Sequence, residues 1–158
     1  MTLREQFRQP TYLGYLALAR ILIGYHFTMV AWGKLSRGYG GDDLRRILAA
    51  GTDQPATWHR AFIEGFVIPN ADWFSQLVAF GELAIGLSLL TGCLVRVASA
   101  FGALENFNIY LAVADSPAEN ALHRMYILLQ IVFVITAAGR SLGLDAWLHR
   151  RFPRARVF

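Results

Sequence analysis

The sequence is poor in the residues and motifs that most soluble enzymes use. Charged residues make up 16% of the 158 residues, against about 25% in an average soluble domain. The only cysteine is Cys93, which excludes an internal disulfide, a CxxC redox pair and a cysteine-based zinc site. GxGxxG, P-loop, HExxH, GxSxG and EF-hand patterns are absent, so no motif indicates nucleotide, calcium or protease chemistry. Histidines and carboxylates are too few at helical spacing for a haem or di-metal site, and we expect neither metal nor haem.

Hydrophobic residues, in contrast, account for 55% of the chain and gather in long runs. Four runs, at about 12–33, 73–92, 95–114 and 117–139, are each long enough for a helix to cross ~30 Å of hydrocarbon. The net charge of +4 comes largely from basic residues that flank these runs. This distribution fits membrane topology better than a nucleic-acid-binding face. The polar start of the chain is too short for a cleaved signal peptide, so we expect the first run to remain as a span.

These runs predict an all-α integral membrane protein, a four-helix bundle with antiparallel up-down topology and a single domain over residues 1–158. The second and third runs are joined so tightly that only a helical hairpin is possible. The long connection, 34–72, is expected to hold a helix from Asp42 or Asp43 to Ala50 and another from Pro55 to Pro69. This helical loop would lie on the membrane surface or cap the bundle.

The basic residues also predict the orientation. An even number of spans places both termini on one side, together with Arg96, Arg140 and the basic tail 140–158. Lysine and arginine in short segments mark the cytoplasmic side. We therefore expect a bacterial-type inner-membrane protein with both termini in the cytoplasm and a tail that is solvated or faces lipid headgroups.

Polar residues interrupt the middle of the runs, where they are costly enough to suggest function. Arg20, Glu82, Glu105 and Gln130 lie at comparable depths and predict one polar layer. Arg20 could form a structural ion pair with one glutamate. Alternatively, because one arginine cannot neutralise two buried carboxylates, one glutamate would hold a proton near neutral pH. Such a carboxyl could bind a quinone headgroup or relay a proton.

Neighbouring residues extend this predicted layer. Asn108 shares a helix face with Glu105, Tyr126 precedes Gln130 by one turn, and His26 is a further titratable group. The candidate catalytic residues are Glu82, Arg20 and Glu105. The candidate cofactor-binding residues are Arg20, His26, Glu82, Asn108, Tyr126 and Gln130.

Several short motifs, in this order, give the chain a family resemblance that extends from Tyr12 to Leu148. They are Leu18-Ala19-Arg20-Ile21-Leu22-Ile23-Gly24, Gly33-Lys34-Leu35, Gly81-Glu82-Leu83-Ala84-Ile85-Gly86-Leu87 with Gly92 and Arg96, and Gly139-Arg140-Ser141-Leu142-Gly143-Leu144-Asp145. The chain resembles the DoxX/DoxD family of four-helix inner-membrane proteins. Its long first loop, ending in Phe66-Val67-Ile68-Pro69, is similar to that of the DoxD branch, the small subunit of thiosulfate:quinone oxidoreductase.

The resemblance implies a membrane subunit of a quinone-linked oxidoreductase that passes electrons from thiosulfate to a quinone. It implies a quinone as cofactor, with the lipid bilayer and other membrane or periplasmic subunits as partners, and no nucleic acid. Family matches fall on Arg20, Lys34, Glu82, Arg96 and Asp145. The alternative is a non-catalytic accessory or anchor subunit of a larger respiratory or photosynthetic complex. A small transporter would need a continuous polar path through the bundle.

Overall fold

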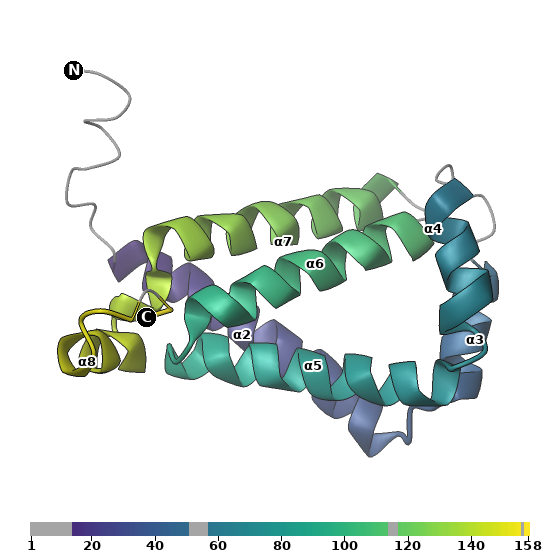
Figure 1. Cartoon of the computed structure of the whole chain (residues 1–158), viewed down its shortest axis with the longest axis horizontal. Helices are drawn as coiled ribbons and strands as arrows, with labels where there is room; N and C mark the ends of the chain where they lie inside the picture. The colour runs from purple at the N-terminus through teal and green to yellow at the C-terminus, as the bar shows by residue number, and fades with distance from the viewer. Residues whose placement is uncertain (1–13, 51–56, 114–116, 156) are drawn as a thin grey trace.

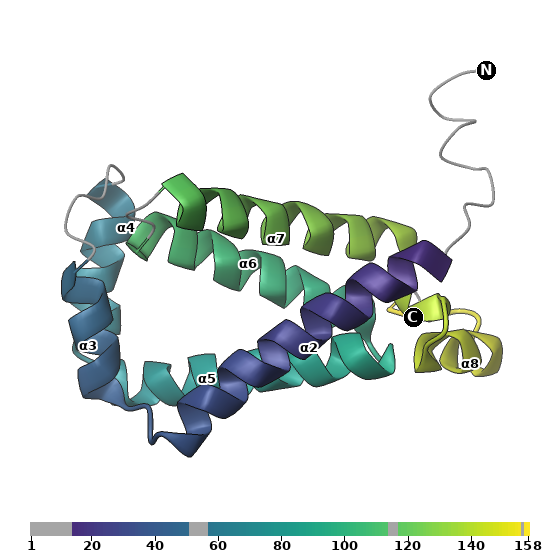
Figure 2. The ribbon, with the colours of Figure 1, turned by 180° about the vertical axis from the view of Figure 1, so that it is seen from behind.

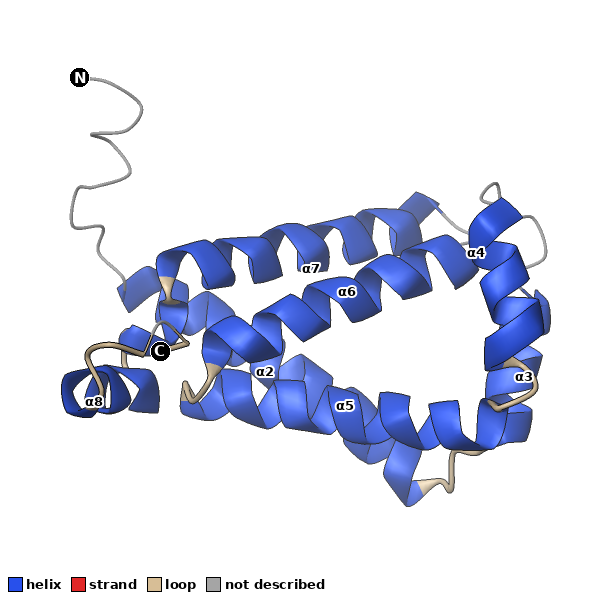
Figure 3. Cartoon of the chain, in the orientation of Figure 1, coloured by secondary structure: helices blue, strands red, loops and turns tan. Residues whose placement is uncertain are grey.

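The computed structural model describes residues 14–50, 57–113, 117–155 and 157–158. All regular structure in this part of the chain is helical, and four long helices dominate it (Figures 1 and 3). They are α2 (Gly14–Ser36), α5 (Ala71–Thr91), α6 (Val95–Val113) and α7 (Pro117–Thr136). The all-helical prediction is confirmed, and each long helix falls within three residues of its predicted limits wherever these lie in described residues.

Shorter helices occupy the two ends of the molecule. At one end lie α3 (Gly41–Ala50), α4 (Thr57–Phe62) and the π-helix η1 (Ile63–Val67), which together form the predicted helical loop. The predicted end at Ala50 is confirmed, and the predicted start at Pro55 lies outside the described residues. At the other end, the 3-10 helix η2 (Ala138–Arg140) and α8 (Leu144–Arg151) follow α7 (Figure 2).

Three of the long helices, α2, α5 and α7, are long and apolar enough to cross a membrane. The exception is α6, whose apolar surface is interrupted by Arg96, Glu105, Asn106 and Asn108. The structure therefore confirms that the protein is helical and gives three of the four predicted spans as candidates. A fourth span through α6 stays a prediction.

Small residues fix the main helix crossing. At the contact between α2 and α5, a methyl group on Gly24 would lie 2.8 Å from the Leu90 nitrogen, and one on Gly86 would lie 2.7 Å from the Thr28 nitrogen. Only glycine fits at such a distance, because both backbones occupy the space of a side chain. Helices α2 and α5 therefore form one close pair, and α6 and α7 form the other (Figure 1).

The two pairs meet at the hairpin between α5 and α6 and then diverge (Figure 1). Gly92 ends α5 in the left-handed region, with φ +69°, and its backbone N–H donates to the Ser88 carbonyl. One apolar cluster lies near the hairpin and includes Ile23, Leu89 and Phe133. A second apolar cluster lies beneath α3 and η1 and includes Leu44.

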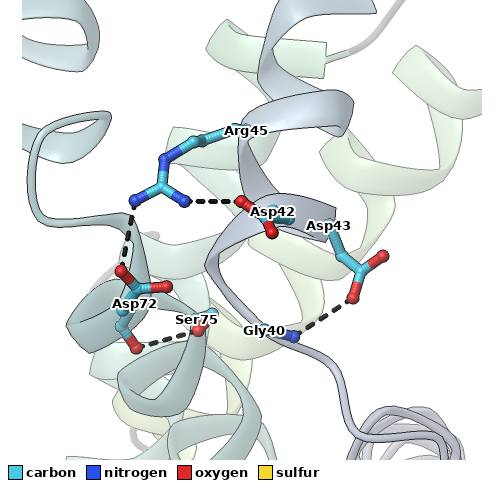
Figure 4. Close-up of polar contacts among 6 residues, drawn as sticks. All are labelled: Gly40, Asp42, Asp43, Arg45, Asp72 and Ser75. Carbon is cyan, nitrogen blue, oxygen red and sulfur yellow. Dashed lines mark hydrogen bonds and ion pairs between the residues drawn. The ribbon is translucent and has the colours of Figure 1, made fainter.

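Ion pairs tie α3 to α5 at the opposite end. The Arg45 guanidinium donates to Asp42 at 2.8 Å and to Asp72 at the start of α5 at 3.2 Å (Figure 4). Asp43 accepts from the Gly40 backbone N–H at 3.2 Å, which supports the first turn of α3. Helices α3, α4 and η1 thus form a cap at the end where the long helices diverge.

Candidate functional site

Arg20 forms hydrogen bonds around the hairpin between α5 and α6 and no ion pair with a glutamate of the described residues. Its side chain is fully buried, and the guanidinium donates to backbone carbonyls at the end of α5 and in the segment before α8. The acceptors are Leu89 and Leu90 (3.4 Å) on α5, and Ser141 (3.1 Å) and Leu142 (3.3 Å) before α8. The predicted ion pair of Arg20 with a glutamate is wrong. Carbonyls left without partners at a helix C-terminus are natural acceptors for a cation.

Asp145 holds the same hairpin from the other side. Its two carboxylate oxygens accept from the backbone N–H groups of Leu94 (2.7 Å) and Val95 (3.0 Å), which begin α6. The Asp145 N–H in turn donates to the Gly92 carbonyl at 2.8 Å. A carboxylate at a helix N-terminus satisfies free donors and matches the helix dipole. Arg20 and Asp145 therefore form a structural clamp around the hairpin.

Glu82 instead forms an ion pair with Lys34, the last basic residue of α2. The Lys34 Nζ lies 2.5 Å from Glu82 Oε1, and the Glu82 side chain is 6% exposed. The same ammonium lies 5.4 Å from the centre of the Tyr39 ring, a distance at which a cation and an aromatic face attract each other. Burial, followed by the charges of Glu82 and Asp43, raises the pKa of Tyr39 to about 12. Tyr39 therefore stays neutral beside the pair.

A pocket of about 760 Å³ opens beside this ion pair, where α5 and α6 diverge. Its walls are almost entirely apolar side chains from α3, α4, η1, α5 and α6. Among the described residues, the polar side chains that reach it are those of Lys34, Tyr39, Ser88, Glu105 and Asn108. A volume of this size and a lining with few polar groups are typical of a site for a small organic ligand.

Several of the apolar residues that line this pocket keep a large exposed area. They include Leu77 on α5 and Phe101 and Leu104 on α6, which are 49%, 62% and 56% exposed. In a bilayer, side chains in such positions contact lipid tails. These exposed areas show that the described part of the chain does not seal the pocket.

Glu105 is the carboxylate that faces the pocket without a partner. Both of its oxygens are buried, and neither has a hydrogen-bond partner among the described residues. Asn108 lines the same pocket, as the shared helix face predicts, and contacts the His59 ring nitrogen at 3.3 Å. A buried carboxyl without a partner costs free energy unless a proton or a ligand satisfies it. Glu105 is therefore the group in this pocket best placed to bind a ligand.

Gln130 belongs to a different environment, the seam between α6 and α7. It is fully buried against Gly102, and neither its amide nitrogen nor its amide oxygen has a hydrogen-bond partner among the described residues. Nearby in the seam, Asn106 donates to the Gly102 carbonyl at 2.9 Å and lies 3.1 Å from His123. The prediction of one continuous polar layer is wrong, because Arg20, Glu82 and Gln130 each have separate surroundings.

His26 on α2 and Tyr126 on α7 contact each other, and Tyr126 is half-buried against the apolar cluster near the hairpin. Their rings stack with centres 5.2 Å apart, and His26 is exposed. Neither residue lines the pocket. Of the predicted site residues, Glu105 and Asn108 line the pocket. Glu82 does not line it but is paired with Lys34, which does. The other four predicted residues lie outside the pocket: Arg20, His26, Tyr126 and Gln130.

Two important residues of the pocket were missing from the predicted site. Lys34 could have been found, because helical spacing places it on the same face as Gly24, Phe27 and Ala31, which is the buried face of α2. Tyr39 follows a turn after α2 and carries no periodic signal. Its position depends on how α3 folds back over the pocket.

The arrangement defines a class of protein: a helical membrane protein with an apolar pocket that carries a carboxylate and an ion pair at its polar end. Comparison with known families is more specific. A DoxX family model matches residues 15–115, which is more than half of the chain, and the chain belongs to the DoxX family. Searches of curated proteins and of solved structures find no match. The match covers the Lys34–Glu82 pair, Arg20 and Glu105, and ends before Asp145.

Proposed function

We propose that this DoxX-family chain is a membrane subunit of a quinone-linked oxidoreductase, and that the pocket between α5 and α6 binds the quinone. The observation that supports this function most strongly is the Glu105 carboxyl in an apolar pocket, with no hydrogen-bond partner among the described residues. A quinone has the matching shape, a small polar ring and an apolar tail. The ring would lie at Glu105 and Asn108, and the tail would follow the apolar wall toward the bilayer.

The chemistry of the lining residues suits this ligand. When bound, a quinone accepts two electrons and two protons to become a quinol. Glu105 can hold a proton and donate a hydrogen bond toward a ring oxygen. Lys34, held in an ion pair by Glu82, places ammonium N–H donors at the same end of the pocket, where they can donate a hydrogen bond to a ring oxygen. The apolar walls exclude water from the ring.

The electrons must come from another protein in this proposal. The sequence has one cysteine, so this chain alone forms no thiol pair that could carry them. A thiosulfate-oxidising partner, as in the DoxD branch, is the donor we propose, and it would dock on the side of the membrane where α3, α4 and η1 cap the pocket.

We further propose that α6 crosses the membrane as a fourth span, so that the four long helices run up and down with both termini in the cytoplasm. The short connections that hold Arg96 and Arg140 support this orientation. Fusions at Phe158 test it: a fused green fluorescent protein should be fluorescent and a fused alkaline phosphatase inactive. The reverse pattern would contradict the orientation.

Quinone binding to variants of the purified full chain tests the proposed function. Titration of the protein in nanodiscs with a short-tailed quinone should give saturable binding, and Glu105→Gln should weaken it about 10- to 100-fold, the range for a hydrogen bond that involves a charged or acidic group. Ala84→Phe adds bulk to the pocket wall without a change of charge and should also weaken binding. Glu64→Gln is the matched control, because Glu64 is exposed and pairs with Arg60. Equal affinity in all four proteins would refute the site.

One observation favours an accessory role as a second candidate. Only 11% of the apolar window of α7 is buried within the chain, against 33% for α2 and α5. A span that contacts so little of its own chain offers a long face to another membrane protein. A stable, monodisperse monomer after gentle extraction of the native membrane would contradict this candidate.

A further inference from the structure

A second cavity, of about 360 Å³, lies at the turn between α2 and α3. It shares Lys34, Tyr39 and Ile47 with the quinone pocket. Its remaining lining includes Arg37, Arg46 and Asp43. The proposed function uses none of these three residues.

Positive charge exceeds negative charge around this cavity. Lys34 is neutralised by Glu82, and Asp43 lies 3.6 Å from Arg46 and offsets one arginine. The charge of Arg37 remains. Its Nε donates to the Gly33 carbonyl at 2.8 Å, while its two terminal nitrogens make no hydrogen bond or ion pair to the described residues. Two guanidinium groups, one of them with both outer nitrogens free, therefore border one cavity.

The position of the cavity indicates the source of the anion. Trp32, one turn before the end of α2, is 63% exposed, and Trp73, near the start of α5 at the same end of the molecule, is 61% exposed. Exposed tryptophans at the ends of spans mark the membrane–water interface. The cavity thus lies at the depth of lipid headgroups, and Ile47 and Tyr39 add apolar side chains to its lining.

We propose that this cavity is a binding site for the phosphate of an anionic phospholipid, held by Arg37 and Arg46. Guanidinium groups bind phosphate oxygens through paired N–H donors, which a single ammonium cannot do. The lipid would contact the outer side of the Lys34 and Tyr39 wall while the quinone contacts the inner side. The site is independent of the proposed function, because neither arginine lines the quinone pocket.

Lipid selectivity of the full chain tests this proposal. The purified protein in neutral detergent is titrated with phosphatidylglycerol and with phosphatidylcholine, and bound lipid is counted by native mass spectrometry. We expect phosphatidylglycerol to bind more tightly, with a loss of about fivefold for each arginine in Arg37→Gln and Arg46→Gln. Arg60→Gln removes the same charge from α4 at the same end of the molecule and should leave the selectivity unchanged. Arg37→Lys/Arg46→Lys should restore part of it and shows whether the site needs charge alone.

Other outcomes would overturn the proposal. Equal binding of the two lipids would do so, as would an equal loss in Arg60→Gln, which would indicate a general effect of net charge. Tight binding of inorganic phosphate that displaces phosphatidylglycerol would identify a free-phosphate site instead of a lipid site. If Arg37→Gln does not fold, Arg46→Gln decides, because Arg46 is 80% exposed on α3. Quinone binding is measured on the same variants, and its failure in the wild type would refute the proposed function without any bearing on lipid selectivity.

Discussion

The pairing of Lys34 with Glu82 allows the sharpest test of the structure. Lys34→Met leaves the Glu82 carboxylate, 6% exposed, with no opposite charge. Removing one partner of a buried ion pair costs about 3–5 kcal/mol, and we expect about 3 kcal/mol because the Lys34 side chain is 22% exposed. Glu82→Gln should cost less, about 2 kcal/mol, since the lysine can turn toward water. The double variant should cost no more than about 3 kcal/mol.

These values give a coupling energy of about 2 kcal/mol between the two side chains. The assay is equilibrium unfolding of the four proteins of the cycle in mixed micelles, followed by tryptophan fluorescence and circular dichroism. The control cycle uses Arg60 and Glu64, a pair at 2.8 Å whose side chains are 56% and 57% exposed. That pair should show about 0.3–0.5 kcal/mol.

A third cycle separates the two possible partners of Glu82. Arg20→Met and Glu82→Gln should be additive to within about 0.5 kcal/mol, because Arg20 bonds only to backbone carbonyls. Additivity between Lys34 and Glu82, together with strong coupling between Arg20 and Glu82, would refute the structure and restore the pairing expected from the sequence.

Three further predictions concern the hairpin. Asp145→Asn should destabilise the protein by about 2–4 kcal/mol in the same unfolding assay, because the charged acceptor of two N–H groups of α6 is lost; a change below about 0.5 kcal/mol would contradict the clamp. Gly92→Ala should cost more than about 2 kcal/mol, since its φ is +69° and a methyl group would lie 2.9 Å from the Arg20 guanidinium, whereas Gly14→Ala, with nothing within 4 Å, should cost nothing measurable. Cys93 should react more slowly than a free thiol with iodoacetamide near pH 8, because burial, followed by the charge of Asp145, raises its pKa; rapid labelling would contradict this.

The sequence alone predicted the helices well because their signal is local. Apolar runs of fixed length, the tight connection at Gly92 and the start at Pro117 are all readable along the chain, and the long helices follow them closely. The short helices of the loop were also predicted, although the change from α to π-helix at Ile63 was not. No local pattern in the sequence indicates that change.

The contacts of the polar residues were harder to predict because depth does not determine direction. Counting along each run places Arg20, Glu82 and Gln130 in one layer, but the direction of each side chain depends on helix rotation and on the crossing at Gly24 and Gly86. The prediction for Glu105 and Asn108 was better, since two residues on one helix face keep their relation wherever the helix turns. Neither the ion pair of Glu82 with a lysine at the end of α2 nor the pocket beside it could be found without the tertiary arrangement.

Photoaffinity labelling of the full chain in nanodiscs tests the central claim most directly. An azidoquinone that binds the pocket should label peptides of α5 and α6 around Leu77, Leu104 and Glu105, and excess unlabelled quinone should prevent the labelling. Glu105→Gln should reduce it, while Glu64→Gln should not. Labelling confined to the outer face of α7, or labelling that unlabelled quinone fails to prevent, would contradict a quinone site between α5 and α6.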